Sequence, residues 1–315
     1  MSSSLLLQVS RAEYWRQITY KKLEETYGPK TSFRKWSKFF HSYYVDYFNT
    51  HLDNKFKHYE LVKIFAWKTS ILYHTNTENI LKLFTETLTI VNKNKIPLIS
   101  TDELCKKVPE KLAGSLIEKA GYDEFEQLVL RYSLMGFGDG LFLSIDREVY
   151  EFLEKSSKLP VLEGFASPFN HNLSNYCSLF HQDETYGGLG PYEEYIEKLT
   201  IPVRLCLNPP YVNNIIATCI EKLINYMTRY RGEFIMMVPV VQNFFPLETL
   251  LTFGNTRHNI MEPGSHTLHN FIQEQDIVAP IKLYIICNIG GSADESQRFA
   301  NDISFFLRKK SCKIK

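Results

Sequence analysis

The sequence predicts an α/β protein in which a helical domain, residues 1–150, is followed by a domain of alternating strands and helices, residues 151–315. Apolar residues recur at three- and four-residue spacing through most of the first part, and strand alternation is scarce there. The composition changes near residues 156–160, after which short apolar runs alternate with Gly and Pro. With 44% hydrophobic residues in 315, the chain can fill the core of one large domain or two ordinary ones.

Helical periodicity in the first domain defines five segments, because apolar residues three and four positions apart share one face of a helix. The segments are residues 12–18, 33–52, 60–72, 78–91 and 123–132.

One stretch of the first domain mixes basic and aromatic side chains, from Arg34 and Lys35 to Phe40. Proteins bind RNA by pairing positive charge with phosphates and by stacking rings on unpaired bases. Arg34 and Lys35 are therefore candidate substrate-binding residues. The alternative is a helix in which Trp36 and Phe40 face the core while the lysine faces water.

The second domain contains a strand–helix–strand unit. Residues 203–207 form an apolar run broken only by Arg204, and residues 234–241 form a second run that is typical of a buried strand. Between them, apolar residues at helical spacing define one face of a helix over residues 212–227. Such a unit has parallel strands, and open α/β sheets bind ligands beyond the carboxyl ends of their strands.

The most informative motif is Asn208-Pro209-Pro210-Tyr211, which lies where the first of these strands ends. The lone pair of an exocyclic amine such as adenine N6 is delocalised into its ring. The Asn208 side-chain carbonyl and the Pro209 backbone carbonyl can accept the two N–H bonds of that amine. The two prolines stiffen the turn and remove competing donors. Acceptors fixed in this way are worth several kcal/mol at order of magnitude, and Tyr211 can stack on the base.

A methyl transfer to this amine requires S-adenosyl-L-methionine, since no side chain supplies an activated methyl group. Glu163 follows a predicted buried strand, residues 159–162, at the place where an acidic residue can meet the amino or ribose groups of that donor. The alternatives are structural: a Pro-Pro turn that only ends a strand, and a surface turn at Glu163.

Four segments in order resemble the catalytic core of the cap-specific adenosine N6-methyltransferase (phosphorylated-CTD-interacting factor) family. They are residues 163–170, 176–180, 186–191 and 208–211. Further similarity around residues 238–239, 264–266 and 281–287 extends the resemblance over roughly residues 125–290. It implies a helical domain before a Rossmann-like class I methyltransferase domain, S-adenosyl-L-methionine as cofactor, and methylation at N6 of an adenosine.

Carried over by residue, the resemblance implies that Asn208, Pro209, Pro210 and Tyr211 hold the target adenine. The residues implied to wall the cofactor pocket, together with Asn208, are Glu163, Phe165, Ala166, Ser167, Pro168 and Asn170.

The chain departs from the family pattern in two respects. The motif ends in Tyr211 where the family has Phe, and no WW-like segment is expected before the catalytic core. The substrate is therefore a cap-adjacent adenosine or another adenosine of mRNA or poly(A). Two further hypotheses stay open: a DNA adenine or protein glutamine N-methyltransferase, which uses the same turn, and a non-catalytic RNA-binding subunit.

Histidines offer a weaker signal. His266 and His269 follow Glu262, but two histidines without a third firm ligand are poor evidence for a metal, and methyl transfer needs none. We expect no metal and a loop near the substrate, with His266 as a candidate RNA contact.

Composition and cysteine usage predict an intracellular protein. The net charge of +1 gives no strong field toward a polyanion, and six cysteines without a C-x-x-C pair are typical of reduced thiols. No signal peptide or membrane span is expected. The Lys-, Asn- and Ile-rich composition is typical of an AT-rich genome, as in a protist or a large DNA virus. We expect RNA as partner, association with other RNA-processing proteins, and a nuclear or cytoplasmic location, or a viral factory or virion if viral.

Overall fold

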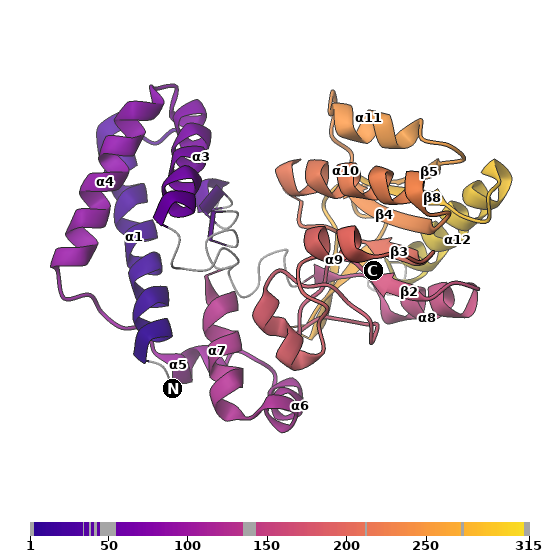
Figure 1. The fold of residues 1–315 in the computed structure, drawn as a ribbon, viewed down its shortest axis with the longest axis horizontal. Coiled ribbons are helices and arrows are strands. Elements are labelled where there is room, and N and C mark those ends of the chain that lie inside the picture. The colour runs from indigo at the N-terminus through magenta and orange to yellow at the C-terminus, as the bar shows by residue number, and fades with distance from the viewer. Residues whose placement is uncertain are drawn as a thin grey trace. The chain divides into compact units, whose positions relative to one another are not determined.

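The structure is a computed structural model that describes residues 3–33, 35–37, 39–40, 43–44, 55–134, 143–211, 213–271 and 274–311. The chain divides into two compact units, Met1–Phe137 and Gly138–Lys315 (Figure 1). The predicted boundary at residue 150 falls inside helix α8 (Arg147–Lys155), which belongs to the second unit.

The first unit is helical in its described part, as the sequence predicts. Its helices are α1 (Ser3–Tyr27), α3 (Lys55–Tyr73), α4 (Thr77–Lys93), α5 (Thr101–Cys105), α6 (Glu110–Ala120) and α7 (Tyr122–Ser133). An aromatic core joins three of them, since Trp15 of α1 contacts Phe65 of α3 and Phe84 of α4 edge to face, with ring centroids 6.1 and 5.6 Å away. The Trp15 indole N–H is satisfied by the Thr87 hydroxyl at 3.0 Å. Helices α1, α3, α4 and α7 confirm the helical periodicity at residues 12–18, 60–72, 78–91 and 123–132.

The second unit contains a five-stranded mixed sheet in the order β2-β3-β4-β8-β5. Strands β2 (Val161–Glu163), β3 (Arg204–Leu207) and β4 (Glu233–Pro239) are parallel, as the strand–helix–strand pattern predicts. Strand β8 (Leu283–Asn288) runs antiparallel to both of its neighbours, β4 and β5 (Arg257–Met261). A second, antiparallel sheet has the order β1-β6-β7, with β1 (Leu143–Ser144), β6 (Thr267–Asn270) and β7 (Gln275–Val278).

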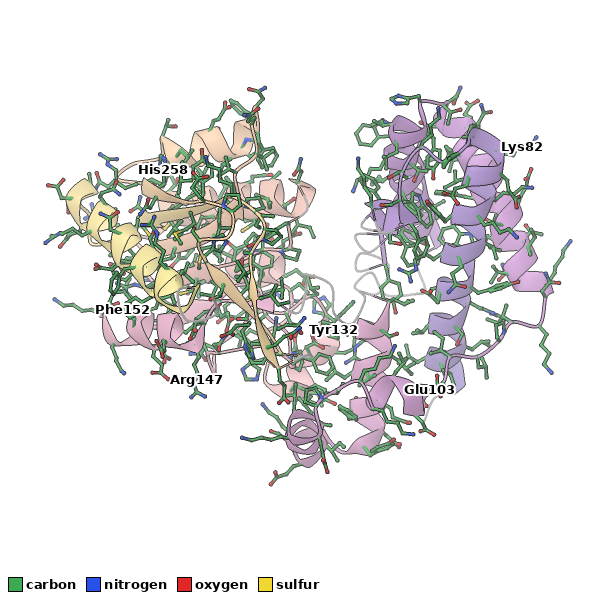
Figure 2. The ribbon with its side chains drawn as sticks, turned by 180° about the vertical axis from the view of Figure 1, so that it is seen from behind. Lys82, Glu103, Tyr132, Arg147, Phe152 and His258 are labelled. Atoms are coloured by element: carbon green, nitrogen blue, oxygen red, sulfur yellow. The ribbon has the colours of Figure 1, made fainter. Side chains whose placement is uncertain are left out.

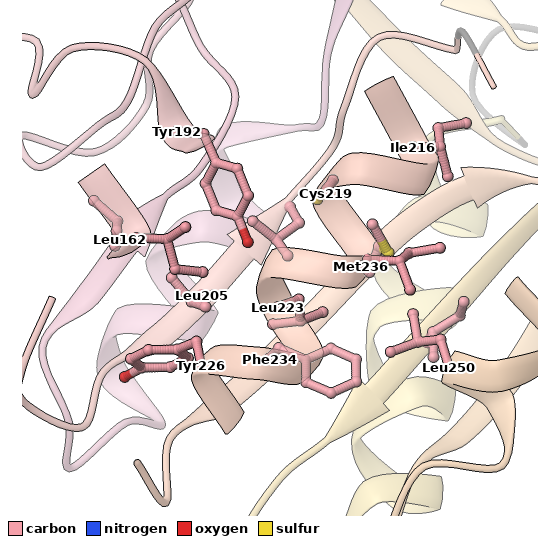
Figure 3. Packing of buried hydrophobic residues seen from close by; sticks show 14 of the residues in the cluster. Leu162, Tyr192, Leu205, Ile216, Cys219, Leu223, Tyr226, Phe234, Met236 and Leu250 are labelled. Atoms are coloured by element: carbon pink, nitrogen blue, oxygen red, sulfur yellow. The ribbon is translucent and has the colours of Figure 1, made fainter. Parts of the chain in front are cut away.

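Helices cover both faces of the five-stranded sheet (Figure 1). One face packs against α9 (Tyr192–Lys198), α10 (Asn213–Arg229) and α11 (Phe245–Leu251), and the other against α8 and α12 (Ala293–Ser311). Because strand side chains alternate, Leu205 joins the first core while Cys206 joins the second. Figure 3 shows Leu205 and Phe234 of the strands against Leu223 of α10.

The second face is closed by aromatic contacts between helices. Phe152 of α8, which is labelled in Figure 2, lies against Phe299 and Phe306 of α12, with both pairs of ring centroids 5.1 Å apart. Within the described parts of the chain, no helix has the length and apolar character that crossing a membrane requires.

Candidate functional site

Three segments of the chain leave the sheet at one edge, which we call the carboxyl edge. They follow the parallel strands β2, β3 and β4 and comprise residues 164–170, 208–211 and 240–244. Glu163 of β2 lies opposite Cys206 of β3, and Leu207 lies opposite Met236 of β4, so β2 and β3 end within one residue of each other while β4 runs three residues further, to Pro239. Ligands of open α/β sheets bind at such an edge.

The 208–211 turn continues β3, in which all four residues are buried. Asn208 is half-buried and Pro209 is buried, so the turn packs against the protein but leaves part of Asn208 accessible to a ligand. The Tyr211 hydroxyl donates a hydrogen bond to Asn208 Oδ1 over 3.3 Å, and the Tyr211 ring packs against the core under α8 and α12. Burial raises the pKa of the Tyr211 phenol, so the hydroxyl stays a donor. Tyr211 therefore orients the Asn208 amide while one lone pair of Oδ1 stays open to a ligand.

Glu163 is almost fully buried, with 2% of its surface exposed. Its Oε2 accepts hydrogen bonds from the backbone N–H groups of Asn172 at 2.8 Å and Leu173 at 3.1 Å. Burial raises the pKa of this carboxyl to about 7, while these bonds and one from the Tyr150 side chain oppose the shift. Glu163 thus ties the chain around residue 172 to the end of β2, and its carboxylate is engaged within the protein.

Tyr150, Ser144 and Asn172 complete this network, although no sequence signal points to them. The Tyr150 side chain hydrogen-bonds to those of Glu163 and Ser144, and Asn172 Nδ2 donates to Ser144 Oγ over 2.8 Å. No local pattern marks these residues, because α8 and β1 bring them to Glu163 only in the fold.

The other residues expected to wall a cofactor pocket lie together directly after β2. The Ser167 hydroxyl donates to Asn170 Oδ1 over 2.7 Å, which closes a turn, and Ala166, Ser167, Pro168 and Asn170 are all buried. Phe165 is half-buried, and its ring lies 4.8 Å from that of Tyr192.

Gly164 is required by packing between neighbouring strands. A Cβ at this position would lie 2.3 Å from Leu207 Cδ2 of β3 and 3.1 Å from Cδ2 of the Tyr192 ring. The small residue thus lets β3 and α9 approach the turn after β2.

His266 is fully buried, so its ring does not reach a surface where RNA could bind. Burial lowers the pKa of the ring, and a hydrogen bond from the ring to the Glu262 backbone carbonyl opposes that shift. The expected loop around residues 266–269 is wrong, since His266 directly precedes β6. His269 lies within β6 and contacts Asp276 of β7 through Nδ1 and Oδ1 at 2.8 Å. Cross-strand pairing places these polar residues in a sheet.

The two basic residues expected to bind RNA belong to the first unit. Arg34 lies outside the described residues, and Lys35 is exposed. Trp36 and Phe40 are fully buried, so the rings serve the helical core while the lysine faces water. The alternative interpretation is therefore confirmed for the two rings, whereas RNA binding by Lys35 stays a prediction.

Where residues are described, no group of three or more His, Cys, Asp or Glu side chains is arranged to hold a metal ion. The described cysteines, Cys105, Cys177, Cys206, Cys219 and Cys287, are free thiols.

Comparison with known proteins gives one family match, and no curated protein matches the chain. The match is to the family described as the phosphorylated CTD interacting factor 1 WW domain and covers residues 122–270. In this structure the matched residues run from α7 to β6 and include β2, β3, β4 and the 208–211 turn. Similarity over these residues links the protein to the phosphorylated CTD interacting factor 1 family.

Proposed function

We propose that the protein is an S-adenosyl-L-methionine-dependent RNA adenosine N6-methyltransferase with a Rossmann-like catalytic domain in its second unit. The observation that carries the proposal is the position of Asn208-Pro209-Pro210-Tyr211 at the carboxyl end of the central strand of three parallel ones. The link to the phosphorylated CTD interacting factor 1 family supports it. The substrate is a cap-adjacent adenosine or another adenosine of mRNA or poly(A).

In this mechanism the turn binds and polarises the target amine. Asn208 Oδ1 and the Pro209 carbonyl accept the two N–H groups of adenine N6, which directs the nitrogen lone pair out of the ring. Tyr211 holds the Asn208 amide in place through its hydroxyl, as its 3.3 Å contact indicates. The part of its half-buried ring that stays accessible stacks on the base. The proton leaves to water after transfer.

The residues at the carboxyl edge fit the cofactor in part. Phe165 and Asn208 are half-buried, so they would hold S-adenosyl-L-methionine by ring and amide contacts. The wall of the cofactor pocket would be supported from behind by four buried residues, Ala166, Ser167, Pro168 and Asn170. Glu163 fits less well as a direct ligand, since its carboxylate is engaged by Asn172 and Leu173. When bound, the cofactor supplies the activated methyl group.

The proposal is tested with Asn208→Ala. Loss of one preorganised acceptor should lower the methylation rate at saturating S-adenosyl-L-methionine by about 100-fold or more, while the circular dichroism spectrum stays that of the parent. An Asn208→Ala protein that methylates capped or A-rich RNA at the parental rate would refute the assignment.

A substrate panel separates the remaining hypotheses. Tritium transfer to RNA but not to duplex DNA or glutamine-containing release-factor peptides is expected. Transfer to either of the last two would instead assign a DNA adenine or protein glutamine methyltransferase. A protein that binds RNA but gives no heat with S-adenosyl-L-methionine would be a non-catalytic subunit. Nucleoside mass spectrometry of RNAs that differ only at the 5′ end tells whether the cap is required.

A further inference from the structure

The segment after β4 leaves the sheet beside the 208–211 turn. Strand β4 lies next to β3 with Leu207 opposite Met236, and it continues three residues further to Pro239. The Val240 N–H then donates to the Lys282 carbonyl over 3.0 Å. The chain therefore stays bonded to β8 as far as Val240 and leaves the sheet after it, on the side of β3 away from β2.

The helix that follows holds this segment in place. Helix α11 begins at Phe245 and buries Leu247 and Leu250 in the core shared with α10. Phe244, at the start of that helix, is half-buried and packs against the same core. Since α10 begins just after the 208–211 turn, both helices start at the carboxyl edge.

Three side chains of the segment are exposed, and together they have the chemistry of a nucleobase site. Phe245 exposes 75% of its surface, more than the other exposed large apolar residues of the described chain. Gln242 and Asn243 are exposed too, and Asn243 has a left-handed backbone with φ of 55°. An aromatic ring stacks on an unpaired base, and carboxamides donate to and accept from its edge. A single exposed ring in a segment with two exposed amides is too small an apolar patch for a stable protein interface.

We propose that residues 242–245 bind an unpaired nucleobase of the RNA substrate that lies next to the target adenosine. Phe245 provides the stacking surface, and Gln242 and Asn243 contact the edge of the base. The inference rests on the proposed function, because that function places the target adenosine at the 208–211 turn of the same edge.

Binding of RNA by the full chain tests the inference with Phe245→Ala. Phe245 is exposed, so this change leaves the core intact. Affinity for a short single-stranded A-rich RNA, measured by fluorescence anisotropy, should fall about 5- to 150-fold, the loss expected for one stacked base. Affinity for adenosine monophosphate, which has no flanking base, should not change. Phe245→Trp should retain binding of the longer RNA, because indole also stacks.

The matched control is Phe305→Ala, because Phe305 is 67% exposed on α12, which covers the opposite face. This variant should bind both ligands as the parent does. Asn243→Gly tests the amide separately, since glycine accepts the left-handed backbone and removes only the side chain. It should weaken discrimination between bases at the flanking position.

The inference is overturned if Phe245→Ala binds the RNA as tightly as the parent, or if Phe305→Ala weakens binding equally. Such a result leaves the proposed function intact when Asn208→Ala still abolishes methylation. Failure of the proposed function itself would be seen in a different measurement, because the parent protein would then methylate no RNA.

Discussion

The Glu163 carboxylate accepts a hydrogen bond of 2.8 Å from the backbone N–H of Asn172, nine residues further along the chain. This bond joins the end of β2 to the loop that contains residues 172 and 173. Because the carboxyl group is buried, its ionised form is disfavoured in the folded state. Protonation of Glu163 is therefore linked to the free energy of unfolding of the unit.

Stability should therefore fall as the pH rises through the range in which Glu163 loses its proton. Its pKa is raised from 4.5 in the unfolded chain to about 7 in the fold, chiefly by burial. The native state binds the proton more tightly, so the contribution of Glu163 is fully present below pH 4.5 and is lost as the pH rises to about 7. The loss amounts to about 3 kcal/mol at order of magnitude.

The measurement is urea unfolding of the parent and Glu163→Gln across this pH range. The glutamine variant has no charge to bury, so the free energy of unfolding of the parent should decline relative to that of the variant. The difference should level off once the carboxyl is ionised. Parallel pH profiles for the two proteins would show that Glu163 does not titrate in this range.

Removal of the Tyr211 hydroxyl should slow catalysis without weakening RNA binding. Tyr211→Phe keeps the ring and deletes the donor to Asn208 Oδ1. A neutral hydrogen bond is worth about 0.5–1.5 kcal/mol, so kcat should fall by about two- to tenfold while KM for RNA stays constant. Tyr122→Phe, a change at an exposed tyrosine of α7, serves as the control. A fall in affinity with constant kcat would instead assign the hydroxyl to substrate binding.

Gly164→Ala should destabilise the second unit, because the new Cβ would lie 2.3 Å from Leu207 Cδ2. Leu207 is fully buried in the core, so its side chain has little free space to shift into, and a cost of about 1–3 kcal/mol is expected. Gly114→Ala in α6 is the matched control, since nothing lies within 4 Å of its Cβ position and alanine favours a helix. Relative to the parent, the melting temperature should fall for Gly164→Ala and rise for Gly114→Ala. A Gly164→Ala protein as stable as the parent would show that the contact relaxes without cost.

The sequence predicted the centre of the second unit because its signals there are local. The apolar runs that form β3 and β4 reflect the burial of a parallel strand on both of its faces. The apolar spacing of α10 reflects the burial of one side of a helix. Strand β5 carries the sequence Arg-His-Asn-Ile-Met and lies at a sheet edge, so it shows neither pattern. It escaped prediction for that reason.

The side-chain environments were harder to predict than the elements. Glu163 was placed correctly at the end of a strand, but its partners at residues 172 and 173 come from a loop with no periodic pattern. His266 lies among polar neighbours in the sequence and is nevertheless fully buried, because it leads into β6, whose first residues Thr267 and Leu268 are buried too. The function of Asn208 stays a prediction from the motif.

Arg204 should contribute more than any other charged residue to the stability of the amino end of the sheet. It is buried, with Nη2 2.6 Å from the Glu233 carboxylate of the neighbouring strand, and Nη1 donates to the Leu153 carbonyl and the Ser156 hydroxyl. Arg204→Met keeps the aliphatic bulk but leaves Glu233 without its cation, and breaking a buried pair in this way costs about 3–5 kcal/mol.

Urea unfolding should show this loss, with the low end of the range expected because the Gly290 N–H still donates to Glu233 Oε1 over 3.0 Å. Arg147→Met is the control, since that arginine is 78% exposed beside Glu151, and such surface pairs are worth at most about 1 kcal/mol. A double variant, Arg204→Met with Glu233→Gln, should recover part of the stability, because no unpaired charge stays buried. If the double variant is no more stable than Arg204→Met alone, the cost comes from the lost contacts to α8 and not from the stranded carboxylate.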